Sequence, residues 1–264
     1  MKRLVVVGDS DIAYWPKELL PSASSCDDAG KGGIVAKTTE WDQPPLVSGY
    51  SGATLAGVLP HLRMVLAESS MADSSCGGEH KGTSRRLPSD ETTNTNTLIV
   101  VACAGENDIG EGLSLGHSVE ALREFADTIF HDHNDQCGDN DNVFLIFLGP
   151  KFEPWLEHDP SEKKKYTAMA RAFRRCLEEY QYDDSSNTST NISENKKDGR
   201  IHFIDCLTIF CGETANVPGA RLGGRAKADP RFFASDQLHL SKEGYAIWKE
   251  VVETRIRLCL ASSR

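Results

Sequence analysis

The sequence has no long apolar stretch and no closely spaced cysteine pair. No run of 18 or more apolar residues occurs in the 264 residues, so we expect no transmembrane helix. The eight cysteines are scattered and form no Cys-x-x-Cys motif, which argues against a zinc site and a thioredoxin-type redox motif. Cys103 and Cys206 lie in apolar runs and are expected to be buried free thiols. Free thiols favour a reducing compartment.

Positive charge is also scarce. The chain has 29 Lys and Arg residues against 39 Asp and Glu residues, a formal net charge of −10. A nucleic-acid-binding protein needs a basic patch or stripe, so no nucleic acid is expected as a partner. The apolar run Leu4–Val7 near the start of the chain is too short for a signal peptide. We therefore expect a cytoplasmic protein.

What the sequence does contain is an alternation of strand and helix patterns. Unbroken apolar runs are typical of strands covered on both faces, and apolar residues spaced by three and four predict helices between them. The alternation predicts an α/β protein with three layers, α/β/α, around a parallel five-stranded flavodoxin-like sheet. The expected strands are Arg3–Gly8, one within Ile34–Ser48, Leu98–Ala104, Val143–Leu148 and Ile201–Asp205; the expected helices are Thr54–Ala67, Val119–Phe130, Ser161–Tyr180 and Ser241–Leu260.

Two features interrupt this regular order. Pro60 lies inside the first expected helix and predicts a kink or a break there. Residues 21–33, 69–97 and 183–199 are rich in small polar residues and are long for loops of a compact domain. We interpret them as disordered surface insertions in a single domain that spans residues 1–264.

Four short polar segments lie at the ends of the expected elements. In open parallel sheets, ligands bind beyond the carboxyl ends of the strands, so these segments are the candidates for chemistry. An acyl-transfer site needs a nucleophile, a base, an acid that orients the base, and donors for the oxyanion. The segments are Gly8-Asp9-Ser10 after the first strand, Gly49–Thr54 after the second, Gly105–Asp108 after the third, and Asp236–His239 before the last helix.

Each segment supplies a residue type that this chemistry requires. A serine at a strand-to-helix turn, such as Ser10, has an exposed hydroxyl and an amide that is free to donate. Gly52 has no side chain and lets a substrate oxygen approach its amide. Asn107 carries a neutral donor that does not titrate. Asp236 and His239 are three residues apart, so one turn of backbone can hold carboxylate and imidazole together.

Each segment also has a structural alternative. Ser10 alone fits a helix N-cap, Gly52 a turn glycine, and Asn107 a turn or cap residue. Asp236 and His239 alone fit a capping arrangement before the last helix. The joint occurrence of all four segments, in order and at the ends of elements, favours the functional interpretation.

This order of segments resembles the SGNH, or GDSL-type, esterase and lipase superfamily. The resemblance implies that Ser10 is the nucleophile and that Asp236 and His239 are the acid and base. It implies an oxyanion hole formed by the amides of Ser10 and Gly52 and the side chain of Asn107. No metal and no cofactor are implied. Asp11 stands where the family often has Leu, and the segments Ala104–Ile109, Gly149–Trp155 and Asp236–Tyr245 are similar to a subgroup of small GDSL-like acylhydrolases.

The expected function is therefore that of a serine esterase that cleaves a small-molecule carboxylic ester through an acyl-enzyme. Two alternatives remain open at the level of sequence. One is a non-catalytic binding module on the same fold. The other is a flavodoxin-like phosphate or nucleotide binder, but the chain contains neither G-x-G-x-x-G nor G-x-x-x-x-G-K-[ST], the loops with which such proteins bind phosphate.

Two further groups of residues could have a functional role. His131, Asp132, His133 and Asp135 form a metal-like cluster, but the loop that follows lacks the Gly and Glu positions of an EF-hand. We interpret the cluster as a solvated helix end without a metal. Trp15, Trp41 and Trp155 are expected either to line an acyl pocket near Ser10 or to pack in the core.

Overall fold

The computed structural model describes residues 1–20, 41–74, 96–132, 142–186, 199–211 and 227–263. Its strands are β1 (Lys2–Gly8), β2 (Leu46–Gly49), β3 (Thr97–Cys103), β4 (Asn142–Leu148) and β5 (Ile201–Ile204). They form one five-stranded sheet with the order β2-β1-β3-β4-β5. Every neighbouring pair is parallel, which confirms the predicted sheet.

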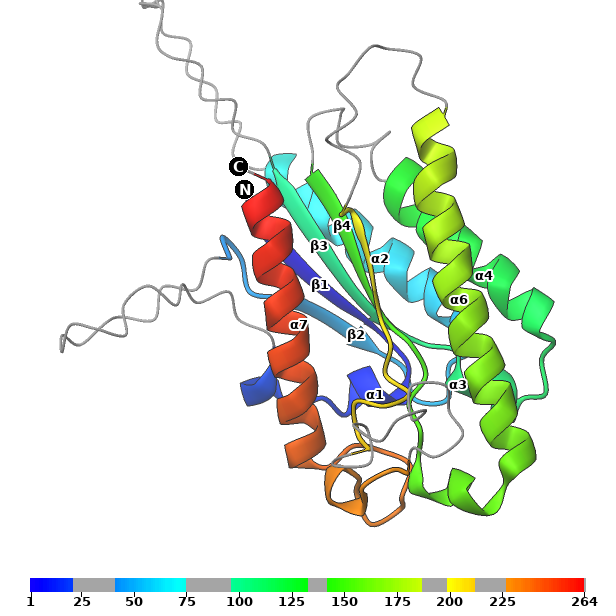
Figure 1. Cartoon of the computed structure of the whole chain (residues 1–264). Coiled ribbons are helices and arrows are strands. Elements are labelled where there is room, and N and C mark those ends of the chain that lie inside the picture. Colours follow the sequence, from blue (N-terminus) through cyan, green and yellow to red (C-terminus); the bar gives the residue numbers. More distant parts are fainter. Residues whose placement is uncertain (21–40, 75–95, 133–141, 187–198, 212–226, 264) are drawn as a thin grey trace, which may run out of the picture.

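Helices cover both faces of this sheet. They are α1 (Ser10–Ala13), α2 (Leu55–Ser74), α3 (Glu106–Gly110), α4 (Leu115–Asp127), α6 (Pro160–Ser186) and α7 (Lys242–Ser262). One buried core joins the sheet to α2, α4 and α6, and a second core joins its other face to α1 and α7. Figure 1 shows α7 on one side of the strands and α4 and α6 on the other. The predicted three-layer α/β/α arrangement is confirmed.

The central strand β3 shows why its sequence is apolar without interruption. Val100 and Ala102 belong to the core under α2, α4 and α6, whereas Ile99 and Val101 belong to the core under α7. Successive side chains of a strand point to opposite faces. A strand that is covered on both faces is therefore apolar at every position.

The helix α2 continues through Pro60, so the predicted break at this residue is wrong. Pro lacks an N–H, which removes the hydrogen bond to the carbonyl of Ala56 at a cost of about 3 kcal/mol. Pro60 is exposed, while Leu59 and Leu62 beside it are buried. Burial of two such side chains contributes about 3–6 kcal/mol. The packing of the apolar face therefore offsets the local cost of the proline.

Some boundaries differ from the predicted ones. The strand β2 begins at Leu46, at the end of the interval predicted for it, and Thr97 already belongs to β3. The helices α2 and α6 extend to Ser74 and Ser186, so the first residues of two predicted insertions are helical. An anchored helix propagates easily because each further residue adds one hydrogen bond. Residues 75–95 and 187–198 of these insertions, and residues 21–33, lie outside the described residues.

The cysteines behave as expected where the structure describes them. Those at positions 103, 176, 206, 211 and 259 are buried free thiols, which confirms the prediction for Cys103 and Cys206. Cys26, Cys76 and Cys137 lie outside the described residues. Across the described ranges, none of the helices combines the length and the apolar character that a membrane span requires.

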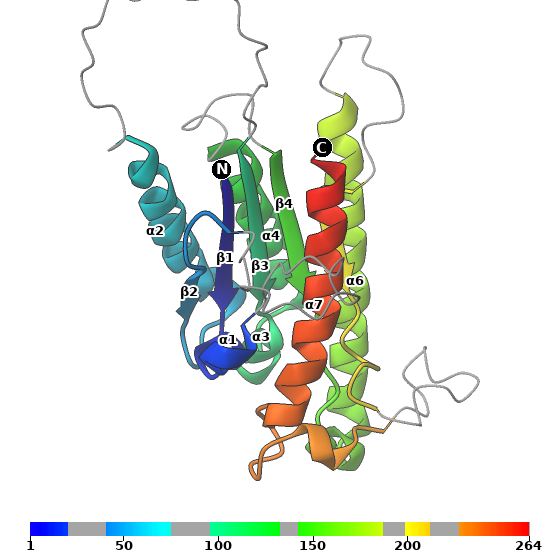
Figure 2. The ribbon, with the colours of Figure 1, turned by 90° about the vertical axis from the view of Figure 1, so that its left-hand side faces the viewer.

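The carboxyl ends of β1 and β3 lie next to each other, because Gly8 pairs with Cys103. The amide of Asp9 donates to the Cys103 carbonyl at 3.0 Å, which continues the contact by one residue. The short helices α1 and α3 start directly beyond these ends and lie beside each other beneath the arrowheads of the strands (Figure 2). The fold thus brings the segments around Ser10 and Asn107 to one edge of the sheet.

Candidate active site

Ser10 is the first residue of α1 and lies two residues beyond the end of β1 at Gly8. The N-cap of this helix is Asp9, whose carboxylate accepts a hydrogen bond from the Asp11 amide at 3.1 Å. Ser10 is therefore not the cap, and this structural alternative is wrong. Its side chain is partly exposed, and its amide belongs to the first turn of a helix, where N–H groups have no intrahelical acceptor.

Gly52 lies in the loop that follows β2. The amide of Tyr50 donates to the Gly8 carbonyl at 2.9 Å, and the Ala53 amide donates to the Tyr50 carbonyl at 3.1 Å. These bonds hold the loop against the end of β1. Gly52 itself has a φ of +77°, a left-handed conformation that favours glycine. The backbone conformation thus explains a glycine at this position.

Asn107 lies in the first turn of α3 and contacts the same loop. Its side-chain amide donates to the carbonyl of Ala53 at 3.0 Å. The next residue, Asp108, accepts from the amide of Leu55, the first residue of α2, at 2.8 Å. Two consecutive side chains therefore attach α3 to the loop that carries Gly52. The carboxylate of Asp108 accepts a hydrogen bond at the N-terminus of α2. Asn107 remains the candidate oxyanion donor of this segment.

The predicted acid–base pair lies in a tight turn before α7. His239 Nδ1 and Asp236 Oδ2 are 2.7 Å apart, so the structure brings the two predicted residues together. The other carboxylate oxygen of Asp236 accepts from the amides of Leu238 at 2.9 Å and His239 at 3.0 Å. The N-cap of α7 is Ser241, whose hydroxyl accepts from the Gly244 amide. The capping alternative for Asp236 is therefore wrong.

The same turn carries a strained residue. Gln237 has a φ of 58° and is the one non-glycine residue with a positive φ among the described residues. Such a conformation costs about 1–2 kcal/mol in an ordinary residue. Strained positions of this kind concentrate at functional sites. Here the conformation allows the carboxylate of Asp236 to face both its own turn and the His239 ring.

The electrostatics of the turn favour an ionised acid. The pKa of the Asp236 carboxyl is lowered to about 2, chiefly because His239 donates a hydrogen bond to it, and further because the amide of Leu238 does. The carboxylate therefore carries its charge throughout the neutral range. A charged carboxylate on Nδ1 fixes the tautomer of the imidazole and leaves Nε2 facing away from the pair.

Contacts with α1 and with Tyr14, the residue directly after it, hold this turn and α7 in place. The ring of Tyr14, directly after α1, makes an edge contact with the ring of His239 at a centroid distance of 4.8 Å. The amide of Tyr14 donates to the Ser10 carbonyl at 2.9 Å. The hydroxyl of Tyr245 donates to the carbonyl of Asp11 at 2.9 Å. Within the described part of the chain, the hydrogen bonds of His239 go to its own turn, and none joins it to the Ser10 hydroxyl.

A pocket of about 440 Å³ lies against His239. Its walls come from the end of α1, the acid–base turn and the start of α7; the lining residues are Tyr14, Pro16, Ala234, Asp236, His239, Leu240, Lys242 and Tyr245. Trp15 and Trp41 do not line this pocket; they are buried in the core under α7. Trp155 donates to Glu153 at 2.6 Å. The core interpretation thus holds for Trp15 and Trp41.

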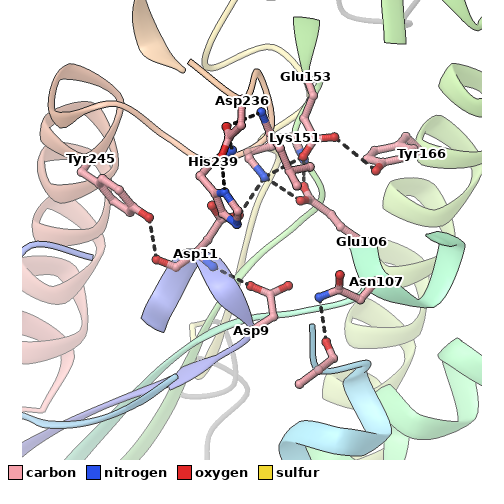
Figure 3. Close-up of polar contacts among 12 residues, drawn as sticks. Asp9, Asp11, Glu106, Asn107, Lys151, Glu153, Tyr166, Asp236, His239 and Tyr245 are labelled. Carbon is pink, nitrogen blue, oxygen red and sulfur yellow. Dashed lines mark hydrogen bonds and ion pairs between the residues drawn. The ribbon is translucent and has the colours of Figure 1, made fainter. Parts of the chain in front are cut away.

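Sequence motifs assigned no role to Lys151, which is buried and contacts Asp11, the residue after Ser10. Lys151 Nζ lies 2.7 Å from Asp11, 2.6 Å from Glu106 and 3.0 Å from Glu153. We refer to these four residues as the Lys151 cluster (Figure 3). The signal for it in the sequence is the segment that follows β4, Gly149–Trp155, with its Lys and Glu two residues apart.

The carboxylates near Ser10 do not form an open metal site. Asp9, Asp11 and Cys103 bring potential ligand atoms within 4.8 Å of one another. However, Lys151 already supplies a cation to Asp11. Burial, and then the charge of Asp11, raise the pKa of Asp9 to about 8. A neutral Asp9 and an ammonium beside Asp11 are a poor donor set for a divalent ion.

The second metal-like cluster is only partly described. His131 is exposed and lies 3.8 Å from Asp127, a residue of the preceding turn. His133 and Asp135 lie outside the described residues. His131 is thus a solvent-exposed residue at a helix end.

The fold resembles those of several solved esterases. An aryl esterase of M. smegmatis is 13% identical, and the likeness covers 98% of this chain and 100% of that chain with a TM-score of 0.50. A carbohydrate acetylesterase family member from Sinorhizobium meliloti is 14% identical over 99% of this chain and 100% of that chain, with a TM-score of 0.49. A catalytic mutant of an acetylxylan esterase from Geobacillus stearothermophilus is 16% identical over 97% of this chain and 93% of that chain, with a TM-score of 0.47. No protein-family model and no curated protein matches the sequence.

Proposed function

We propose that this chain, which has an SGNH hydrolase-type fold, is a serine esterase that cleaves carboxylic esters of small molecules. The observation that carries the proposal is the 2.7 Å contact between His239 Nδ1 and Asp236 Oδ2. A carboxylate on Nδ1 holds the imidazole in the tautomer whose Nε2 can accept a proton. The turn that bears this pair packs on Tyr14, the residue directly after α1, and the first residue of α1 is Ser10.

In the proposed mechanism, Ser10 attacks the ester carbonyl while His239 takes its proton. Asp236 stabilises the imidazolium that forms. His239 then gives this proton to the departing alcohol, which leaves an ester between the acyl group and Ser10. Water attacks this acyl-enzyme with His239 as base, and the acid is released as Ser10 regains its proton.

Three donors are assigned to the oxyanion. The Ser10 amide lies at a helix N-terminus. Gly52 has a left-handed φ and lies in the loop that the bond from the Tyr50 amide to the Gly8 carbonyl holds at the end of β1. Asn107 has a second amide hydrogen besides the one that it donates to Ala53. Removing one such donor typically lowers the rate by about 10²–10³-fold.

A fluorophosphonate probe tests the nucleophile. We expect one label per chain, located on Ser10 by peptide mapping, and no label on Ser10→Ala. Ser161→Ala is the matched control, because Ser161 is an exposed serine at the first turn of another helix. A Ser10→Ala protein that keeps its esterase activity contradicts the proposed nucleophile. A wild-type protein that neither takes the label nor cleaves esters favours the binding module on the same fold. A series of p-nitrophenyl esters with increasing acyl length then defines the acyl group that the enzyme prefers.

A further inference from the structure

Lys151 is enclosed by carboxylates rather than by solvent. Its side chain is 1% exposed, and that of Glu153 is 0% exposed. The three carboxylate oxygens at 2.7, 2.6 and 3.0 Å match the three N–H donors of an ammonium group. Burial lowers the pKa of Lys151, but the charges of Asp11, Glu106 and Glu153 outweigh it and raise the pKa well above its usual value. Lys151 is therefore a charged group whose donors are all used.

The partners of Lys151 come from three neighbouring strand ends. Asp11 lies in α1 beyond β1, Glu106 begins α3 beyond β3, and Lys151 itself follows β4. These strands are adjacent in the sheet. The backbone amide of Lys151 also donates to Glu106 at 2.6 Å. One side chain thus joins the loops that leave three consecutive strands.

Two of these partners are sequence neighbours of proposed site residues. Asp11 directly follows Ser10, and Glu106 directly precedes Asn107. The third partner, Glu153, is held by Trp155 at 2.6 Å and by Tyr166 at 3.4 Å. Glu153 therefore anchors the lysine to α6 and to the loop after β4. Figure 3 shows the side chain of Lys151 between those of Asp11, Glu106 and Glu153.

We propose that Lys151 is a positioning residue that sets the separation between the nucleophile Ser10 and the oxyanion donor Asn107. This inference rests on the proposed function. Lys151 is buried and does not line the pocket beside His239, so it does not contact substrate there. It acts through Asp11 and Glu106, each one residue away from a reacting group.

The charge pattern argues for a role beyond stability. A lone cation among the buried carboxylates of Asp11 and Glu153 and the 12% exposed carboxylate of Glu106 is electrostatically expensive. Apolar replacements of buried ion pairs are often neutral or stabilising. A residue that only packs in the core does not need a charged side chain. Fixed geometry between nucleophile and oxyanion donor, in contrast, acts directly on the transition state, and a misplacement of about 1 Å costs on the order of 10²-fold in rate.

The test compares three variants with the wild-type protein on p-nitrophenyl acetate. Lys151→Met removes the cation, and Glu106→Gln keeps the side-chain volume but replaces one accepting oxygen by a donor. Lys163→Met is the control, because it removes another lysine that forms an ion pair, 2.9 Å from Glu157. Active sites are counted with the fluorophosphonate probe, and kcat and KM are measured well below the thermal midpoint of each variant.

We expect Lys151→Met and Glu106→Gln to lower kcat by about 10–100-fold with KM within about twofold, and Lys163→Met to change neither. If Lys151→Met does not fold, the kcat of Glu106→Gln alone tests the inference. An unchanged kcat per labelled site, with only a lower thermal midpoint, overturns the inference and makes the cluster purely structural. A wild-type protein that is not labelled on Ser10 overturns the proposed function and the inference together; a labelled wild type with unaffected variants overturns the inference alone.

Discussion

The side-chain amide of Asn107 donates to the carbonyl of Ala53 at 3.0 Å, and this bond joins two loops that leave different strands. It places the candidate oxyanion donor beside the loop of Gly52. The neighbouring bond from the Leu55 amide to Asp108 supports the same junction. The amide therefore has one hydrogen engaged in structure and one available for chemistry.

For Asn107→Ala, we expect kcat on p-nitrophenyl acetate to fall by about 10²–10³-fold. The lost bond to Ala53 lowers the free energy of unfolding by only about 1 kcal/mol. Thr54→Ala is the control, because it removes one hydrogen bond to the Gly57 amide from the same loop. Equal rates for both variants contradict the role of Asn107 as a donor.

For Asp236→Asn, we expect a loss of kcat on the order of 10²–10⁴-fold. Asn keeps an oxygen for the amides of Leu238 and His239, so the turn persists, but it no longer stabilises an imidazolium. Asp229→Asn is the control, since Asp229 pairs with Arg231 at 2.6 Å, and among the described residues no hydrogen bond joins its side chain to Asp236 or His239. Similar activities of the two variants speak against an acid role for Asp236.

Acid titration provides a second test of the same pair. The folded-state pKa of Asp236, about 2, lies below that of an unfolded Asp, about 3.9. Its contribution to stability is therefore fully present above about pH 4 and is lost as the pH falls through about 2. The difference in free energy of unfolding between wild type and Asp236→Asn is expected to shrink from pH 5 to pH 2 in denaturant titrations. A constant difference over this range contradicts the lowered pKa.

Asp9 is expected to respond to pH in the opposite direction. Its folded-state pKa, about 8, lies above the unfolded value of about 3.9, so the folded state holds a proton that the unfolded chain releases. Stability from this group therefore falls as the pH rises from about 4 to about 8. Asp9→Asn keeps the helix cap but has no carboxyl group that titrates, so it does not lose stability as the pH rises. We expect the variant to gain stability relative to wild type between pH 5 and pH 9, measured by urea unfolding; parallel curves contradict this.

Pro60→Ala tests the continuous helix α2. Pro60 is exposed, so alanine fits without repacking and restores the N–H that bonds to the Ala56 carbonyl. We expect the free energy of unfolding to rise by about 1–3 kcal/mol, less the small entropic advantage that proline confers in the unfolded chain. Calorimetric melting measures the gain. Unchanged or lower stability indicates that the helix does not form this bond.

The amino-acid sequence by itself determined the parallel sheet and most of its strands. Strands that are covered by helices on both faces, such as β3, have unbroken apolar runs. This pattern is local in the sequence and therefore predicts the strands directly. The motif residues could also be predicted from the sequence, because Ser10 and Asn107 lie in the first turns of α1 and α3, and Asp236 and His239 lie shortly before α7. The pair Asp236 and His239 is local, three residues apart, and the structure brings it together at 2.7 Å.

The tertiary structure alone decided the contacts between distant segments. Lys151 and Asp11 are 140 residues apart, and their ion pair depends on the strand order β1-β3-β4, which no periodicity specifies. The continuous course of α2 through Pro60 likewise depends on the burial of Leu59 and Leu62 rather than on local propensity. A pattern along the sequence does not predict contacts that depend on strand order and packing. Such contacts hold the segment of Ser10 against the segment of Asn107.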